Sequence, residues 1–108
     1  MGVSKMELEK LIDRYIAGLE RDFDRQGFTH VKRGWTTEEG RKYIKIVDGY
    51  VQDNGEIKSR SVTAFIDKAT GDVYKPASWK SPAKGIRFNL YKDIDYLENN
   101  CGSGHLYR

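Results

Sequence analysis

The spacing of apolar residues changes once along this chain, near residue 27, and this change restricts the folds available to it. Before it, apolar side chains recur at three- and four-residue steps, which places them on one stripe of a helix. The stripe consists of Leu8, Leu11, Ile12, Tyr15, Leu19 and Phe23. Ser4 and Glu7 have the spacing of a capping box at a helix start, and Gly27 is suited to end the helix. The sequence therefore predicts an amphipathic helix over about residues 4–26.

From residue 28 to residue 75, apolar and polar residues alternate with the two-residue period of β-strands. Turn signals rich in Gly, Asn, Asp and Thr divide this stretch at residues 36–40, 53–55 and 69–72. The strands are predicted over residues 28–35, 41–47, 57–67 and 73–75. Because consecutive hairpin turns favour an antiparallel meander, we expect the N-terminal helix to lie across one face of such a sheet.

The pattern weakens after Pro76. Residues 79–84 are compatible with a loop or a short helical turn, residues 86–91 with a brief strand, and residues 94–97 with one helical turn. The chain shows no internal repeat and no linker, and its 108 residues are close to the commonest domain size. We therefore predict a single α+β domain over residues 1–108. In it, an N-terminal amphipathic helix packs on a four- to five-stranded antiparallel β-meander, and a basic loop and short C-terminal elements follow over 76–108.

Several classes of protein are disfavoured by composition. Cys101 is the single cysteine, so an intramolecular disulfide is excluded. No apolar run approaches the ~18–20 residues that a membrane span needs, and the N-terminus lacks the apolar core of a signal peptide. We expect a cytoplasmic protein without a membrane partner.

Positive charge is concentrated in the middle of the chain. The whole chain carries 19 basic and 16 acidic residues, a formal charge of +3. Residues 1–26 carry five basic and six acidic side chains, a net −1, whereas residues 41–91 carry ten basic and five acidic ones, a net +5. A local positive field of this kind favours an anionic partner.

The most distinctive segment runs from Lys75 to Arg87 and contains four cations, one tryptophan and no acidic residue. Cations beside an indole suit an anion with a flat part, with phosphate against the cations and a base stacked on the ring. The candidate ligand-binding residues are Lys75, Trp79, Lys80, Lys84, Arg87 and the nearby Asn89. In the alternative interpretation the lysines are simply solvated, and Trp79 anchors the loop to the sheet.

Signals for catalysis and for cofactors are weak. Cys101 and His105 are four residues apart and could meet, but no signature of a cysteine hydrolase surrounds them. One Cys and two His, His30 and His105, fall short of the usual ligand set of a zinc site. The phosphate-binding loop pattern Gly-x-x-x-x-Gly-Lys-Ser/Thr is absent. We therefore predict a protein that is not an enzyme and that needs no metal or cofactor.

Residues 67–85 read DKATGDVYKPASWKSPAKG. This run and its flanks, from Ala64 to Leu90, resemble a recurring segment in a family of small uncharacterised proteins of tailed bacteriophages. The resemblance covers about a quarter of the chain. It implies a viral gene product that acts in the host cytoplasm, and it assigns no role to any residue.

Together these observations predict a non-enzymatic binding protein. Its ligand would be nucleic acid or a nucleotide, including a signalling nucleotide of host defence, and a homo-oligomer with the site between subunits is one form it could take. The alternative is an inhibitor or accessory protein that binds a host protein, because Tyr and Trp are enriched as interface anchors. The candidate anchors are Trp35, Tyr43, Tyr50 and Tyr107.

Overall fold

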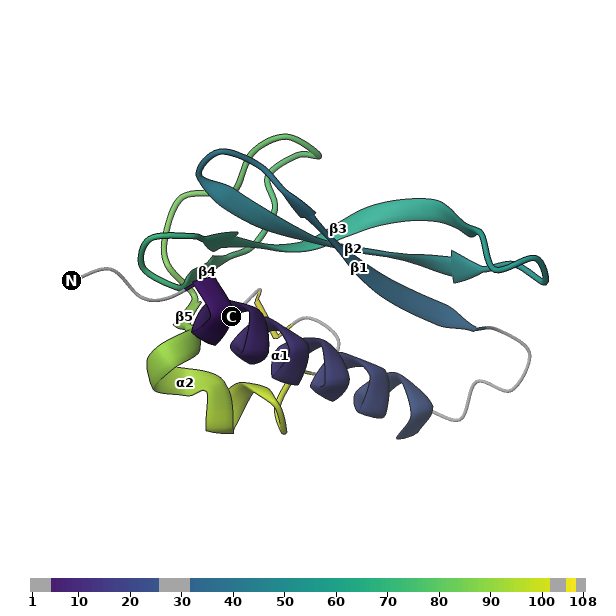
Figure 1. Cartoon of the computed structure of the whole chain (residues 1–108), viewed down its shortest axis with the longest axis horizontal. Helices are drawn as coiled ribbons and strands as arrows, with labels where there is room; N and C mark the ends of the chain where they lie inside the picture. The colour runs from purple at the N-terminus through teal and green to yellow at the C-terminus, as the bar shows by residue number, and fades with distance from the viewer. Residues whose placement is uncertain (1–4, 26–31, 102–104, 107–108) are drawn as a thin grey trace.

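Two helices lie on one side of a five-stranded antiparallel sheet in the computed structural model, and the loop between the last two strands lies on the other side (Figure 1). The structure describes residues 5–25, 32–101 and 105–106. The elements are α1 (Lys5–Arg25), β1 (Arg33–Glu39), β2 (Tyr43–Val51), β3 (Ile57–Asp67), β4 (Asp72–Tyr74), β5 (Phe88–Asn89) and α2 (Leu90–Leu97). The predicted α+β class and the predicted meander are confirmed, since the strands follow one another in the sheet in chain order.

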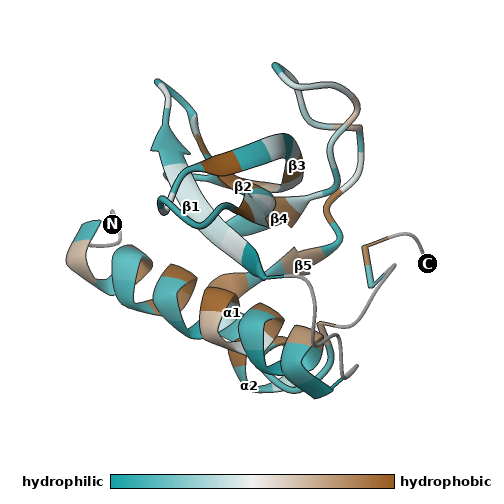
Figure 2. Cartoon of the chain, turned by 90° about the vertical axis from the view of Figure 1, so that its right-hand side faces the viewer, coloured by the Kyte–Doolittle hydropathy of each residue, from teal (hydrophilic) through white to brown (hydrophobic). Residues whose placement is uncertain are grey.

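The predicted helix stripe forms the core with the inner face of the sheet. Leu8, Ile12, Tyr15 and Leu19 of α1 are buried. They form one apolar cluster with residues of the central strands and of α2, among them Ile44, Ile46, Ala64, Ile66, Leu90 and Leu97. Figure 2 shows the hydrophobic residues concentrated where the helices and the central strands meet. Because side chains alternate along a strand, residues next to these inward ones point to the opposite, outer face.

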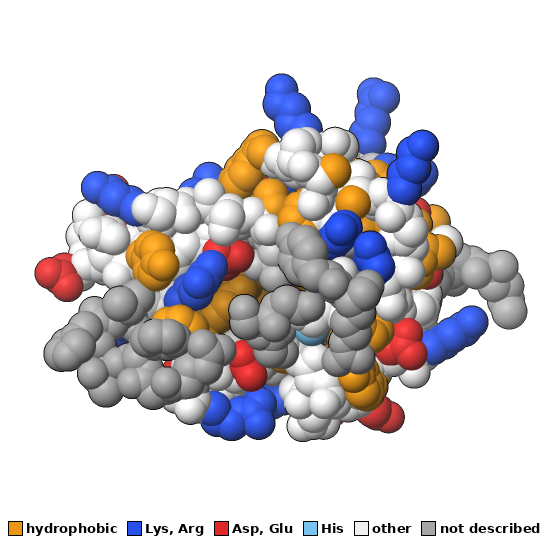
Figure 3. Space-filling model, turned by 180° about the vertical axis from the view of Figure 1, so that it is seen from behind, with side chains coloured by type: hydrophobic (Ala, Val, Ile, Leu, Met, Phe, Trp, Pro, Cys, Tyr) orange, Lys and Arg blue, Asp and Glu red, His pale blue; other side chains and the backbone are white. Residues whose placement is uncertain are grey.

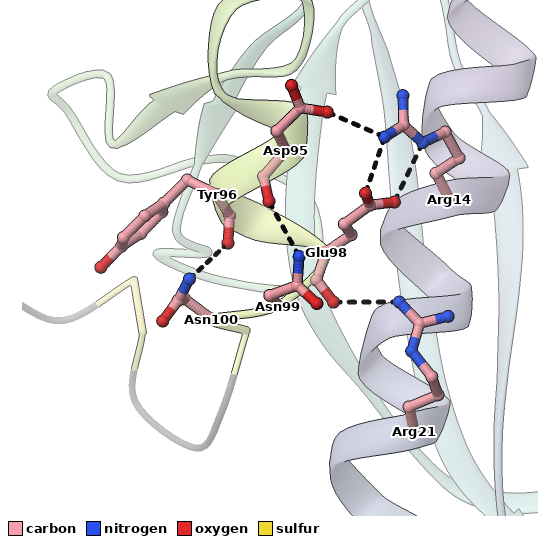
Figure 4. A network of polar contacts seen from close by, with 7 residues as sticks. All are labelled: Arg14, Arg21, Asp95, Tyr96, Glu98, Asn99 and Asn100. Atoms are coloured by element: carbon pink, nitrogen blue, oxygen red, sulfur yellow. Dashed lines mark hydrogen bonds and ion pairs between the residues drawn. The ribbon is translucent and has the colours of Figure 1, made fainter.

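A network of hydrogen bonds and ion pairs holds α1 against the end of α2 (Figure 4). The Arg14 guanidinium donates two hydrogen bonds to the Glu98 carboxylate, at 3.0 and 2.7 Å, and one to Asp95 at 3.0 Å. Arg21 donates to the backbone carbonyl of Glu98 at 3.1 Å. The backbones approach so closely that a Cβ added at Gly18 would lie 2.6 Å from the same carbonyl oxygen. A glycine is therefore required where the two segments meet.

The buried carboxylate of Asp48 is fully engaged in the sheet. It is 5% exposed and accepts hydrogen bonds from Arg33 at 2.6 Å, from Ser61 at 2.7 Å and from Thr63. A buried charge is tolerated only when it is paired and hydrogen-bonded in this way. Asp48 therefore has a structural role beside the β2–β3 bulge, where the register shifts between Asp48 and Tyr50.

The first hairpin turn lies later in the chain than predicted. Residues 36–39, predicted to turn, belong to β1, and Thr36 and Glu39 pair with Val47 and Ile44 of β2. The turn occurs instead at residues 40–42, closed by a hydrogen bond from the Gly40 amide to the Tyr43 carbonyl at 2.8 Å. The prediction was wrong because two threonines, which favour strands, were read as turn residues.

The C-terminal elements also differ from the prediction in extent. The brief strand predicted over 86–91 is limited to Phe88–Asn89, and the single turn predicted over 94–97 is part of the eight-residue helix α2. Residues 79–84 form a loop and not a helical turn. Ser4, Gly27 and residues 28–31 lie outside the described part of the chain. Neither described helix is long and apolar enough to cross a membrane.

Candidate functional site

The basic segment folds into a closed hairpin-like loop. Pro76 and Pro82 form an isolated antiparallel bridge. Inside it, the amides of Ala77 and Ser78 both donate to the Ser81 carbonyl, at 3.0 and 3.1 Å. At its base, the Ala83 amide donates to the carbonyl of Lys75 at 2.8 Å. These backbone bonds fix the position of the tip, which carries Trp79 and Lys80.

Trp79 lies against two cations from the sheet. The ammonium of Lys45, on β2, is 4.3 Å from the centre of the indole ring, and the guanidinium carbon of Arg60, on β3, is 5.2 Å from it. Both distances lie within the range of cation–π attraction. Trp79 is nevertheless 40% exposed. The indole therefore anchors the loop to the sheet and still presents part of its surface to solvent.

Strand register brings Lys45 to the outer face beneath the loop. Lys45 pairs with Glu38 of β1 and with Phe65 of β3, and Phe65 pairs with Tyr74 of β4. These four residues share one face because directly opposed residues in antiparallel strands point to the same side. Tyr43, two residues before Lys45, meets both the Phe65 and the Tyr74 rings edge to face. The outer face thus carries an aromatic row with a cation at its centre.

A backbone irregularity in β3 precedes Arg60. Ser59 adopts a φ of 56°, in the left-handed region that residues other than glycine rarely occupy. It lies where the register between β2 and β3 shifts. Arg60 forms an ion pair with Glu38 on the outer face, as well as its contact with Trp79. The bulge therefore directly precedes Arg60, the β3 residue that contacts both Glu38 of β1 and Trp79 of the loop.

A pocket of about 290 Å³ opens beside this cluster. It is lined by Glu38, Glu39, Gly40, Arg41, Lys42, Tyr43, Lys45, Phe65 and Lys80. Four lining residues are basic and two are acidic, a net charge of +2.

The two acids of the lining are already neutralised by cations. Glu39 contacts Lys68 at 2.6 Å and Lys5 at 3.3 Å, and these cations hold its pKa below the usual value. Glu38 is paired with Arg60. Seen from behind, Lys and Arg side chains project from the top of the molecule, the side on which the loop lies in Figure 1 (Figure 3). Cations therefore project from the outer side of the sheet (Figure 3).

The predicted binding residues are only partly brought together. Lys80 lines the pocket, and Trp79 contacts Lys45, which also lines it. Lys75, Lys84 and Arg87 do not line the pocket, although Lys84 is exposed on the returning arm of the loop. The cations that the sequence prediction missed are Arg41, Lys42, Lys45 and Arg60.

The predicted ligand-binding residue Asn89 has a capping role in the structure. Its side-chain oxygen accepts from the amides of Tyr91 and Lys92, at 3.0 and 3.2 Å, at the start of α2. Its side-chain nitrogen donates to the Thr70 carbonyl and to Asp72, both at 2.9 Å. These four bonds use the full hydrogen-bonding capacity of the side-chain amide, so Asn89 has none left for a ligand.

The predicted interface anchors do not form one patch. Tyr43 belongs to the outer face, whereas Trp35 is half-buried, packs against the core and meets Phe23 edge to face. Tyr50 is exposed and lies under the Arg33 guanidinium, 5.6 Å from the ring centre. Tyr107 lies outside the described residues.

Cys101 and His105 are placed in structural roles. Cys101 is buried, and desolvation raises the pKa of its thiol, which opposes formation of a nucleophilic thiolate. The Nε2 atom of His105 lies 2.5 Å from the hydroxyl of Tyr15, and its ring stacks on Phe88. Over the described ranges, no three His, Cys, Asp or Glu side chains gather as a metal site would require.

No curated protein and no solved structure is significantly similar to this chain. One protein family matches it over residues 2–107, almost the whole length, and carries the description "Family of unknown function (DUF7717)". The chain belongs to this family of unknown function.

Proposed function

We propose that this chain is a non-enzymatic binding protein whose outer sheet face takes an anionic ligand with a flat part, either nucleic acid or a nucleotide. The observation that carries the proposal is the convergence of cations from separate segments on one aromatic cluster. Lys42 and Lys45 come from the β1–β2 hairpin, Arg60 from β3 and Lys80 from the loop. From one segment to another, these cations are 15 to 38 residues apart in sequence, from Lys45 to Arg60 at the least and from Lys42 to Lys80 at the most.

The cluster offers complementary groups to both parts of such a ligand. Phosphate oxygens pair with the ammonium groups of Lys42, Lys45 and Lys80. A base stacks on Trp79, an interaction worth roughly 1–3 kcal/mol per base in proteins that bind single strands. Such a base displaces Lys45 or Arg60 from the indole, and the displaced cation then pairs with phosphate.

The pocket suits the phosphate part of the ligand. Its volume of about 290 Å³ lies just below the ~300–1,000 Å³ of small-ligand sites. Trp79 does not line it, so the base stacks beside the pocket, and a longer strand continues over the cationic surface. The likeness of residues 67–85 to phage proteins supports, within this proposal, a ligand found in a bacterial host during infection.

Titration of a fluorescent single-stranded oligonucleotide at several salt concentrations tests the nucleic-acid version. Affinity is expected to fall steeply with salt, with a slope set by the number of phosphates contacted. Lys45→Met and Lys80→Met each lower the slope by about one. Lys84→Met is the matched control, because Lys84 lies in the same loop but does not line the pocket. Affinity that is independent of salt contradicts this version.

A thermal-shift screen of linear and cyclic nucleotides tests the nucleotide version. A ligand that binds only the folded state raises Tm, by an amount that grows with its concentration over Kd. The shift is expected to disappear in Trp79→Ala and in Lys45→Met and to persist in Lys84→Met. A screen without any shift rejects the nucleotide version.

Binding to a host protein is the second candidate, and the exposed apolar residues of the loop favour it. Ile86 is 57% exposed, and Trp79 is 40% exposed. Capture from nuclease-treated host lysate separates the candidates, because a protein partner survives nuclease treatment and is lost in Ile86→Ser.

A further inference from the structure

The two edges of the sheet differ in a way that points to a partner. One edge is β5, which has only two residues. The other is β1, with seven residues in unbroken register against β2. Soluble proteins usually protect an edge with charged side chains, above all lysine, or with proline, a bulge or a very short strand. Residues 33–39 contain neither lysine nor proline, and the register shifts of this sheet lie between β2 and β3. The charged residues of β1 are Arg33, Glu38 and Glu39, and each is already ion-paired within the chain. β1 is therefore an edge suited to pairing.

Hydrogen bonds at both ends of β1 show which residues face outward. The Val51 amide donates to the Lys32 carbonyl at 2.9 Å, and the Gly40 amide donates to the Tyr43 carbonyl at 2.8 Å. Even-numbered residues therefore direct their backbone groups to β2, since these directions alternate along an antiparallel strand. The outward groups belong to Arg33, Trp35, Thr37 and Glu39. Within the described residues, no backbone group bonds to them.

We propose that β1 pairs antiparallel with β1 of a second copy, with Thr36 on the two-fold axis. In this register Trp35 lies opposite the partner's Thr37, and Arg33 lies opposite the partner's Glu39. All four outward-facing residues of each strand then find hydrogen-bonding partners. Arg33 and Glu39 carry opposite charges, and Glu38 lies opposite the partner's Gly34, so no like charges face each other. The strand is thus complementary to itself in both backbone pattern and charge.

This dimer has a consequence for the proposed ligand site. A two-fold axis normal to the sheet keeps the outer faces of both copies on the same side. The two Trp79 clusters then lie on one continuous ten-stranded surface. The dimer itself does not depend on the ligand, and the experiments that test the dimer are done without any ligand.

A cysteine at the axis tests the register directly. Residues opposite each other in a non-hydrogen-bonded pair have Cα atoms about 4.5 Å apart, within the range of a disulfide. Thr36→Cys is therefore expected to form a disulfide-linked dimer under mild oxidation. Glu38→Cys, on the same strand and face, is the matched control, because its two copies lie about 13 Å apart, four residues along the strand. Equal cross-linking of both variants, or of neither, overturns the proposal.

The mass in solution tests the dimer without any cross-link. Sedimentation of the unmodified chain is expected to give about twice the 12.5 kDa of one copy. Thr37→Pro removes an outward amide, which an edge strand tolerates, and is expected to give a folded monomer. Thr37→Val keeps the amide and remains a dimer. A monomeric unmodified chain, or a dimeric Thr37→Pro, refutes the pairing. If circular dichroism shows that Thr37→Pro is unfolded, the comparison of cross-linking in Thr36→Cys and Glu38→Cys tests the pairing instead.

Discussion

The inner face of the sheet carries Ile44, Ile46 and Ile66 against α1, whereas the outer face carries Tyr43, Lys45 and Phe65 beneath the basic loop. The inner face is covered by two helices and is purely apolar at its centre. The outer face has one covering loop, and its aromatic rings lie beside cations. The inner face is thus the hydrophobic core, whereas the outer face combines aromatic rings with charged side chains.

The largest expected difference is between truncating a buried side chain of the inner face and truncating an aromatic side chain of the outer face. Ile66→Ala, at a site that is 0% exposed, is expected to cost about 2–5 kcal/mol of unfolding free energy, because it leaves a cavity. Trp79→Ala is expected to cost less, since the ring is partly exposed, while ligand binding is lost. Urea denaturation measures the first effect, and titration with ligand measures the second. An equal loss of stability in both variants would make the outer face part of the core.

The close contact between α1 and α2 gives the next largest effect. Helix propensity alone predicts that Gly18→Ala stabilises the chain by about 1 kcal/mol. Its Cβ would lie 2.6 Å from the Glu98 carbonyl oxygen, so we expect a loss of about 1–3 kcal/mol instead. The sign of the change in urea midpoint decides between the two. Ala17→Gly, at the adjacent position of α1, is the control that measures the difference in helix propensity between alanine and glycine alone.

The bulge before Arg60 tests how the outer face is shaped. A left-handed conformation costs a residue other than glycine roughly 1–2 kcal/mol, and a β-branched side chain suffers most. Ser59→Val is expected to lower stability by about that amount, whereas Ser59→Gly stays within about 0.5 kcal/mol of the parent, because relieved strain offsets the entropy of glycine. Thermal unfolding measures both. A tolerated valine would mean that the bulge is not strained.

The ion pair between Arg14 of α1 and Glu98 at the end of α2 predicts that stability depends on pH. Arg14 lowers the pKa of Glu98 from its ordinary value of 4.5, chiefly through their hydrogen bonds. The carboxylate therefore contributes stability that is fully present above pH 4.5 and is lost as the pH falls through the lowered pKa. Glu98→Gln is expected to flatten the dependence of Tm on pH below 4.5. A pH dependence of Tm that is the same in Glu98→Gln as in the parent chain contradicts this role of the Arg14–Glu98 pair.

Part of the candidate site was predictable from sequence. Trp79 and Lys80 belong to one continuous basic segment, so composition alone identifies them. Lys45 and Arg60 were missed because each lies in a strand of ordinary appearance. Alternation in residues 43–47 places Lys45 on the face opposite Ile44 and Ile46. It could not have shown that Trp79 lies above it.

The sequence by itself determined the elements whose signals are local. The stripe of α1 depends on neighbours three and four residues apart, and the strand over 57–67 depends on alternation between two turns, so both were predicted closely. The tertiary structure decided the first hairpin turn, the capping role of Asn89 and the meeting of Lys45, Arg60 and Trp79. These depend on strand register and on the side of the sheet to which the loop folds. Both are set by packing between residues far apart in the chain, which no local pattern encodes.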